Sequence, residues 1–166
     1  MTVSRLRDIP GIGVDKVGDA ADAAAAADPR FLRLENLDTD LRPPQVALEV
    51  GIAQQAVAAA LSHPESGADV AAATRVWQQR STLVLDQLAG YPCVRPHGGW
   101  SLLIDTRSMG LTPGEASRRL FTRAQVAATP MDGWGPSGRR YLRLVFANEP
   151  AERLTDLRPR FDTAFS

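Results

Sequence analysis

An arginine inside a strand-like segment is the first residue that could do chemistry. The segment GRRYLRLVFANEP, residues 138–150, alternates at its centre as a β-strand does. Leu142, Leu144 and Phe146 fall on one face, and Arg143 falls on the other. Arg143 is therefore either a solvated charge on an open sheet face or a guanidinium that grips an anion. A planar guanidinium holds a carboxylate through two hydrogen bonds, which lysine cannot do.

Four further side chains are candidates to line a pocket, namely Asp38, His97, Trp100 and Trp134. His97 precedes a glycine pair and could lie near a pocket, or it could be structural, and Trp100 follows the same pair. Asp38 and Asp40 could form a pair of catalytic carboxylates, or they could be turn residues before two prolines. Trp134 lies in a glycine-rich loop and either lines a ligand cleft or covers the sheet.

Three other kinds of site find no support in the residue pattern. The run GIGVDKVG lacks the third glycine of a dinucleotide-binding fingerprint and follows no strand. His63, His97 and Cys93 are too few and too irregularly spaced for a zinc site. Neither Ser101 nor Ser137 has a base in a recognisable motif, so nucleophilic catalysis is not indicated.

The composition is that of one globular domain of 166 residues, 44% hydrophobic and 23% charged, with a formal net charge of zero. Without a basic excess, nucleic acid is not an expected partner. A single cysteine, Cys93, cannot form an internal disulfide, which favours a reducing cytoplasm. No apolar run reaches membrane length and the N-terminus lacks a signal-peptide core, so we expect a cytoplasmic protein without membrane contact.

The first half of the chain reads as irregular sequence followed by helices. We expect residues 1–18 to be irregular and 19–28 to form a helix through an alanine-rich tract. A short extended run follows at 31–35. Two helices are then predicted, one over 45–61 and a longer one over 68–89.

The second half alternates between strands and helices. We predict a strand at 100–104, a helix at 112–123 with Thr112 and Glu115 forming a capping box, a short strand at 125–130 and the Arg143 strand at 141–147. The last helix should be interrupted at Pro159 and carry the apolar stripe Leu154, Leu157, Phe161 and Phe165. This order predicts an α+β fold, with helices packed on a small, mainly antiparallel sheet.

Three motifs together resemble a known family. PHGGWSLLIDT, VAATPMDGWG and GRRYLRLVFAN, in this order, are similar to the C-terminal small domain of fold-type I, class I/II pyridoxal-phosphate-dependent aminotransferases. LRLENLDTDLRPP resembles the N-terminal arm of that family, and IAQQAVAAAL and VWQQRSTLVLDQL resemble its connecting helices. The resemblance implies an arm at 1–44, connecting helices at 45–90 and a small domain at 91–166.

The resemblance also implies what is missing and what is retained. In the family, a large domain carrying the cofactor and its Schiff-base lysine lies between the arm and the connecting helices. Here the arm is followed almost at once by QVALEVGIAQQAV, and the only lysine, Lys16, lies in the arm. We therefore expect no covalently bound pyridoxal phosphate. Arg143 matches the family arginine that binds the substrate α-carboxylate.

Three functions fit this reading. The chain is a truncated aminotransferase that is inactive alone, an accessory subunit of an aminotransferase, or a repurposed cofactor-free enzyme or carboxylate-binding protein that uses Arg143. The segment 45–61 keeps apolar residues suited to burial, including Ile52 and Val57. We therefore expect a homodimer, or a complex with a partner aminotransferase, built around this segment. A small carboxylate or an amino acid is the expected ligand.

Overall fold

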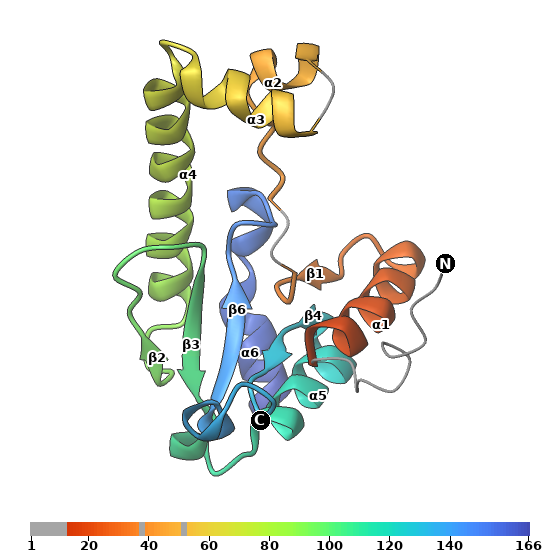
Figure 1. Ribbon diagram of the computed structural model, residues 1–166. Helices are drawn as coiled ribbons and strands as arrows, with labels where there is room; N and C mark the ends of the chain where they lie inside the picture. Colours follow the sequence, from red (N-terminus) through yellow and green to blue (C-terminus); the bar gives the residue numbers. More distant parts are fainter. Residues whose placement is uncertain (1–12, 37–38, 51–52) are drawn as a thin grey trace.

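The computed structural model describes residues 13–36, 39–50 and 53–166 and has the α+β fold that the sequence predicts (Figure 1). The elements in chain order are α1 (Gly13–Ala27), β1 (Leu32–Arg33), α2 (Gln45–Val50), α3 (Ala53–Ser62), α4 (Ser66–Gln87), β2 (Cys93–Val94), β3 (Ser101–Asp105), the 3₁₀ helix η2 (Thr106–Met109), α5 (Pro113–Ala124), β4 (Val126–Ala127), β5 (Thr129–Pro130), the 3₁₀ helix η3 (Pro136–Arg140), β6 (Tyr141–Val145), the 3₁₀ helix η4 (Ala151–Leu154) and α6 (Leu157–Phe165).

A four-stranded antiparallel sheet holds the centre of the molecule, with its strands in the order β2-β3-β6-β5. β3 and β6 pair along their whole length, which places Leu103 opposite Arg143. On its other side β6 pairs with the short strand β5, where Thr129 lies opposite Arg143. Arg143 therefore lies between two neighbouring strands in the interior of the sheet.

The arm contributes one strand, β1, to a second, smaller sheet. β1 pairs in parallel with β4, so Leu32 lies opposite Val126. Just beyond β1, the amide of Leu34 donates to the carbonyl of Ala127 at 3.1 Å, and the amide of Val145 donates to the carbonyl of Leu34 at 2.8 Å. The predicted strand at 125–130 is thus divided, since β4 pairs with the arm and β5 pairs with β6.

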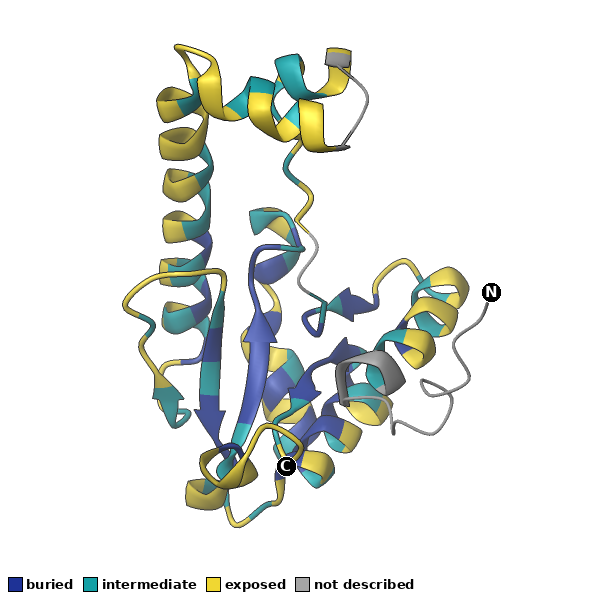
Figure 2. Cartoon of the chain, viewed as in Figure 1, coloured by how far each residue is buried: buried dark blue, intermediate teal, exposed yellow. Residues whose placement is uncertain are grey.

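The main core lies between the sheet and the helices α4, α5 and α6 (Figures 1 and 2). Leu142 and Leu144 of β6 are buried there with Leu120 of α5, Phe161 of α6 and Val84 of α4. Burying a side chain of this size stabilises a fold by about 1.5–3 kcal/mol. The predicted apolar face of the Arg143 strand is therefore the face that forms the core.

The last helical segment is not one interrupted helix. Pro159 does not break α6, because it lies in the first turn, where the backbone amides have no intrahelical acceptor. The residues before it form the separate helix η4. Leu154, Leu157 and Phe161 are buried as the predicted stripe requires.

The first helix is longer than predicted. α1 begins at Gly13, although residues up to 18 were expected to be irregular. Val17 packs against a small cluster formed by Ala21, Phe31 and Ala127, so tertiary contacts extend the helix past Gly18. Phe31 in turn meets the ring of Phe121 edge-on, with 4.8 Å between ring centroids.

The segment from α2 to the first half of α4 extends away from the sheet (Figure 1). The predicted helix at 45–61 is present as two helices, α2 and α3. Of the described residues from Thr39 to Gln79, none is buried, and Figure 2 shows this end of the molecule as exposed or intermediate. Ile52, which was expected to contribute to an apolar surface, lies outside the described residues. Within the described part of the chain, no helix has the length and apolar character needed to cross a membrane.

Candidate functional site

Arg143 lies in a closed environment, not on an open sheet face. Its residue exposure is 6%, because the arm covers the face of β6 from which it projects. One terminal nitrogen, Nη2, donates to the backbone carbonyl of Glu35 at 3.1 Å, and the Thr129 hydroxyl donates to the same carbonyl at 3.1 Å. The interpretation of Arg143 as a solvated charge is therefore wrong.

Trp134 covers the guanidinium on another side. The Arg143 Cζ atom lies 5.3 Å from the centroid of the Trp134 ring, within the range of a cation–π contact. Trp134 itself is 44% exposed, so it stands between the arginine and solvent. A tight loop holds it there, in which the amide of Trp134 donates to the carbonyl of Met131 at 3.0 Å. A Cβ atom at Gly138 would overlap that same carbonyl oxygen, so only glycine fits this close approach.

The buried guanidinium retains unused hydrogen-bonding capacity. Among the described residues, the Nε atom of Arg143 is buried without a hydrogen-bond partner. Burial lowers the pKa of Arg143, and the charge of Glu35 opposes that shift. An arginine remains a cation at neutral pH under such conditions. Arg143 is thus a desolvated cation whose Nε donor is shielded from solvent and has no partner among the described residues.

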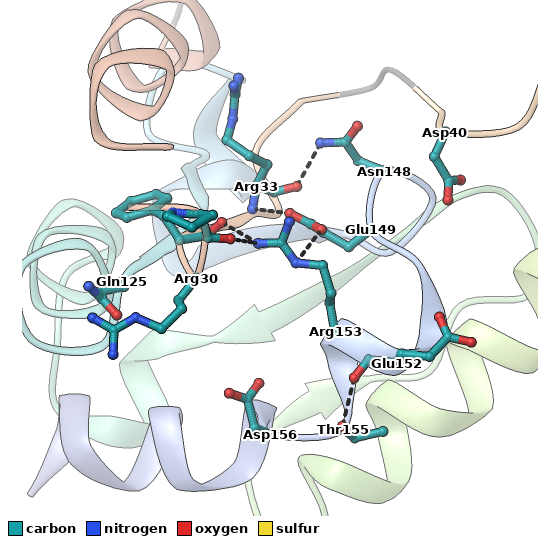
Figure 3. A network of polar contacts seen from close by, with 12 residues as sticks. Arg30, Arg33, Asp40, Gln125, Asn148, Glu149, Glu152, Arg153, Thr155 and Asp156 are labelled. Carbon is teal, nitrogen blue, oxygen red and sulfur yellow. Dashed lines mark hydrogen bonds and ion pairs between the residues drawn. The ribbon is translucent and has the colours of Figure 1, made fainter. Parts of the chain in front are cut away.

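Two buried glutamates bind Arg33 of the arm, and Figure 3 shows the contact with Glu149. Glu35 accepts from the Nε atom of Arg33 at 2.7 Å, while Glu149 accepts from the Arg33 amide at 2.7 Å. Asn148 donates to the Arg33 carbonyl at 2.9 Å, and Arg153 donates to the Phe31 carbonyl at 2.7 Å. The segment after β6 thus holds β1 through both main-chain and side-chain contacts.

These glutamates were not predicted from the sequence. Glu149 is 3% exposed, and burial raises the pKa of its carboxyl, with Arg33 and Arg153 opposing the shift. The only local signal was a glutamate directly after an apolar strand, which equally suits an exposed turn. Both glutamates bind Arg33, which is 116 positions from Glu149 along the chain. The local sequence around Glu149 therefore gives no sign of this contact.

Asp40 is a structural partner of α4. Both terminal nitrogens of Arg80 bind its carboxylate, at 2.7 and 2.8 Å, and Arg80 also donates to the carbonyl of Ala147 at 2.8 Å. This bidentate pair ties the chain before Pro43 to α4 and to the end of β6. Asp38, the other member of the suggested carboxylate pair, lies outside the described residues.

His97 and Trp100 do not join Arg143. They line a separate cavity of about 470 Å³ beside α4, together with Phe146. Phe146 continues the alternation of Leu142 and Leu144, so it points to the opposite side of β6 from Arg143. Of the predicted pocket residues, the structure therefore brings Trp134 to Arg143 and places His97 and Trp100 elsewhere.

The described residues hold no cluster of three or more histidine, cysteine or acidic side chains that could bind a metal ion. Cys93 is a free thiol, and burial raises its pKa to about 11. The one lysine, Lys16, lies in α1, which packs near β1, β4 and β5.

The comparisons with known proteins agree with the resemblance drawn from the motifs. No family model matches the chain. The chain is 29% identical to putative aminotransferase YugH of Bacillus subtilis over 124 residues, which are 74% of this chain and 31% of that protein. It is 31% identical to an aspartate aminotransferase of Pyrococcus abyssi over 96 residues, 57% of this chain and 25% of that protein.

Solved structures give the same result for the fold. The aromatic aminotransferase of Pyrococcus horikoshii aligns with a TM-score of 0.61 at 29% identity, over 66% of this chain and 30% of that one. The aspartate aminotransferase of Thermus thermophilus with maleate aligns with a TM-score of 0.60 at 31% identity, over 68% and 29%. The chain thus spans between 25% and 31% of the length of these relatives.

Proposed function

We propose that this chain, an aminotransferase-like protein that corresponds to part of the fold-type I pyridoxal-phosphate-dependent enzymes, is a non-catalytic subunit that assembles with a partner. The partner is a second copy of the chain or a full-length aminotransferase. The chain keeps the strand that carries Arg143 and lacks the chemical group that would act on an amino acid held there.

The observation that carries this proposal is the position of the single lysine. Lys16 lies in α1, before β1, whereas Arg143 lies on β6. Between the arm and the connecting helices, the chain passes from β1 through Pro43 and Pro44 directly into α2. No segment at this join is long enough to form the large domain that carries the Schiff-base lysine in the related enzymes.

The exposed end of the molecule supports assembly. Leu48 is 51% exposed, Val57 58%, Leu61 79% and Val70 67%, and all four lie on α2, α3 or the start of α4. Leu48 and Val70 also line a cleft of about 490 Å³ between α2, α4 and the two prolines. Monomeric proteins seldom leave contiguous apolar patches larger than a few hundred Å² in contact with water. Burying apolar surface stabilises a complex by about 2.5 kcal/mol per 100 Å². A complex in which a partner covers this end of the molecule is therefore favoured.

Light scattering of the purified protein tests the proposal. We expect the mass of a dimer, and we expect the paired substitution Val57→Asp and Leu61→Asp to give a monomer or an aggregate. Val94→Asp is the matched control, because Val94 is 45% exposed on β2 and lies outside α2, α3 and α4. A cooperatively folded monomer at high micromolar concentration, unchanged in mass by the paired substitution, would contradict assembly through this end.

Carboxylate binding at Arg143 is a second candidate function, favoured by the unpartnered Nε atom beneath Trp134. We expect succinate to bind in the millimolar range, which corresponds to about 4 kcal/mol. Arg143→Lys should remove most of this affinity because the bidentate geometry is lost. Arg139→Lys, an exposed position in η3, is the control. Identical NMR shifts for wild type and Arg143→Lys on titration would exclude binding at this arginine.

A further inference from the structure

The cavity beside α4 has the size and the walls of a small-molecule site. It measures about 470 Å³, within the range of about 300–1,000 Å³ that is usual for ligand pockets. One wall is a face of α4, and the other is the segment from Arg95 to Trp100, which leads into β3. Phe146 closes the inner end and is 2% exposed.

Two indoles form the aromatic part of this cavity. The rings of Trp77 and Trp100 meet edge-on, with 6.5 Å between their centroids and 71° between their planes. Trp100 is 44% exposed, an unusual state for so large an aromatic side chain. A planar ring entering the cavity would pack against this aromatic pair, and offset or edge-on aromatic contacts of this kind are favourable.

Trp77 also carries a hydrogen-bond donor without an acceptor. Its Nε1 atom is buried and has no partner among the described residues. Buried indole N–H groups usually find an acceptor, and each exception calls for an explanation. Because Trp77 lines the cavity, a turn of its indole on binding would bring this shielded N–H group to an acceptor atom of the bound molecule.

The charge of the lining favours an anion. Arg95 and His97 are exposed at the rim, and within the described part of the chain neither takes part in an ion pair. The lining residues include no aspartate or glutamate. Thr74, Gln78 and Ser81 of α4 add neutral polar groups. A cationic ligand would therefore find no counter-charge here, whereas a carboxylate could pair with Arg95.

We propose that this cavity binds a planar aromatic acid. The ring packs against Trp77 and Trp100, and the carboxylate pairs with Arg95. The site is distinct from Arg143, which projects from the other side of β6, and it does not depend on the assembly proposed above.

Calorimetric titration with three probes tests the site. Indole-3-acetate carries both the ring and the carboxylate, tryptamine carries the same ring with a cationic amine, and acetate carries the carboxylate alone. We expect indole-3-acetate to bind with a Kd of about 10–1,000 µM, the range of a modest site with one charge pair and aromatic contacts. Tryptamine and acetate should bind at least about tenfold more weakly, since each lacks one of the two recognised features.

Two substitutions locate the binding. Arg95→Gln should weaken the affinity for indole-3-acetate by about fivefold or more, as expected for the loss of a charge-assisted hydrogen bond. Arg75→Gln, at an exposed arginine of α4 outside the lining of this cavity, is the control and should have no effect. In NMR spectra, the indole N–H signal of Trp77, assigned with Trp77→Phe, should move downfield on binding. The proposal would be overturned if tryptamine bound as well as indole-3-acetate, or if Arg143→Lys weakened binding and Arg95→Gln did not.

Discussion

Glu149 is a carboxyl group that the fold holds almost out of water. Burial raises its pKa above the ordinary value of 4.5, so the folded state binds this proton more tightly than the unfolded state does. The contribution of Glu149 to stability is therefore largest below pH 4.5, and it declines as the pH rises through the folded pKa. The contribution of Glu149 to stability thus changes with pH in the opposite direction to that of a carboxylate held by an exposed ion pair, such as Asp162, whose pKa is lowered.

The pH dependence of the Glu149 contribution can be tested with the variant Glu149→Gln. Glutamine imitates the protonated form and does not titrate, so the free energy of unfolding of wild type should fall relative to that of the variant between pH 4.5 and 7. Urea unfolding across this range measures the difference. Glu152→Gln, an exposed neighbour, should leave the wild-type pH profile unchanged. Parallel profiles for wild type and Glu149→Gln would show that Glu149 titrates alike in both states.

Cys93 should be an unreactive thiol in the native protein. Its pKa is raised to about 11 from an ordinary value of 9.0, so the thiolate at pH 8 is scarcer by about a hundredfold than in the unfolded chain. We expect alkylation by iodoacetamide to be slower by about that factor in the native protein than in urea. A native rate equal to the rate in urea would show that the thiol is accessible and unperturbed.

The sequence could place Arg143 on a strand but could not decide its environment. The alternation of apolar residues depends on local sequence and correctly separates the two faces of β6. The group that covers the Arg143 guanidinium is the backbone carbonyl of Glu35, which lies 108 positions before Arg143 in the chain. Nothing in the local pattern shows that the arm returns to this strand. For the same reason, the sequence leaves open whether Trp134 lines a ligand cleft or covers the sheet, and its contact with Arg143 was not predicted.

The loop between β5 and β6 requires a glycine at position 138. Its tight turn brings the Met131 carbonyl against the Cα atom of Gly138 and sets Trp134 over Arg143. Gly138→Ala should destabilise the fold by about 1–3 kcal/mol, because the backbone must move to admit a methyl group. Gly133→Ala in the same loop is the control, since an added Cβ there meets nothing within 4 Å. Equal melting temperatures for the two variants would contradict this close approach.

Elements with local signals were predicted well. The hydroxyl of Thr112 accepts from the amide of Glu115 at 3.2 Å and starts α5 at Pro113, as the cap motif indicates. The reciprocal bond of a full capping box is replaced, because the Glu115 carboxylate pairs with Arg119 at 2.7 Å. Features that depend on distant partners were missed, namely the extension of α1 onto Phe31 and the division of residues 125–130 between two sheets.

In the molecule as a whole, most of the described chain packs around a core and one end does not. The sheet with α5, α6 and the second half of α4 holds the core, whereas α2, α3 and the first half of α4 contribute no buried residue among those described. The bidentate pair between Arg80 and Asp40 lies at the boundary between these parts. An element that keeps apolar residues and buries few of them is suited to a partner surface, and this distribution underlies the proposed assembly.

We infer that this aminotransferase-like chain does not perform pyridoxal chemistry by itself. The most direct test is to incubate the purified protein with pyridoxal phosphate, reduce with borohydride and map the peptides, alongside an assay for amino-group transfer. We predict no stoichiometric adduct on Lys16 and no turnover, because the only lysine lies in the arm and does not match the Schiff-base lysine of the family. An adduct on Lys16 at full occupancy, together with transaminase turnover, would contradict the account.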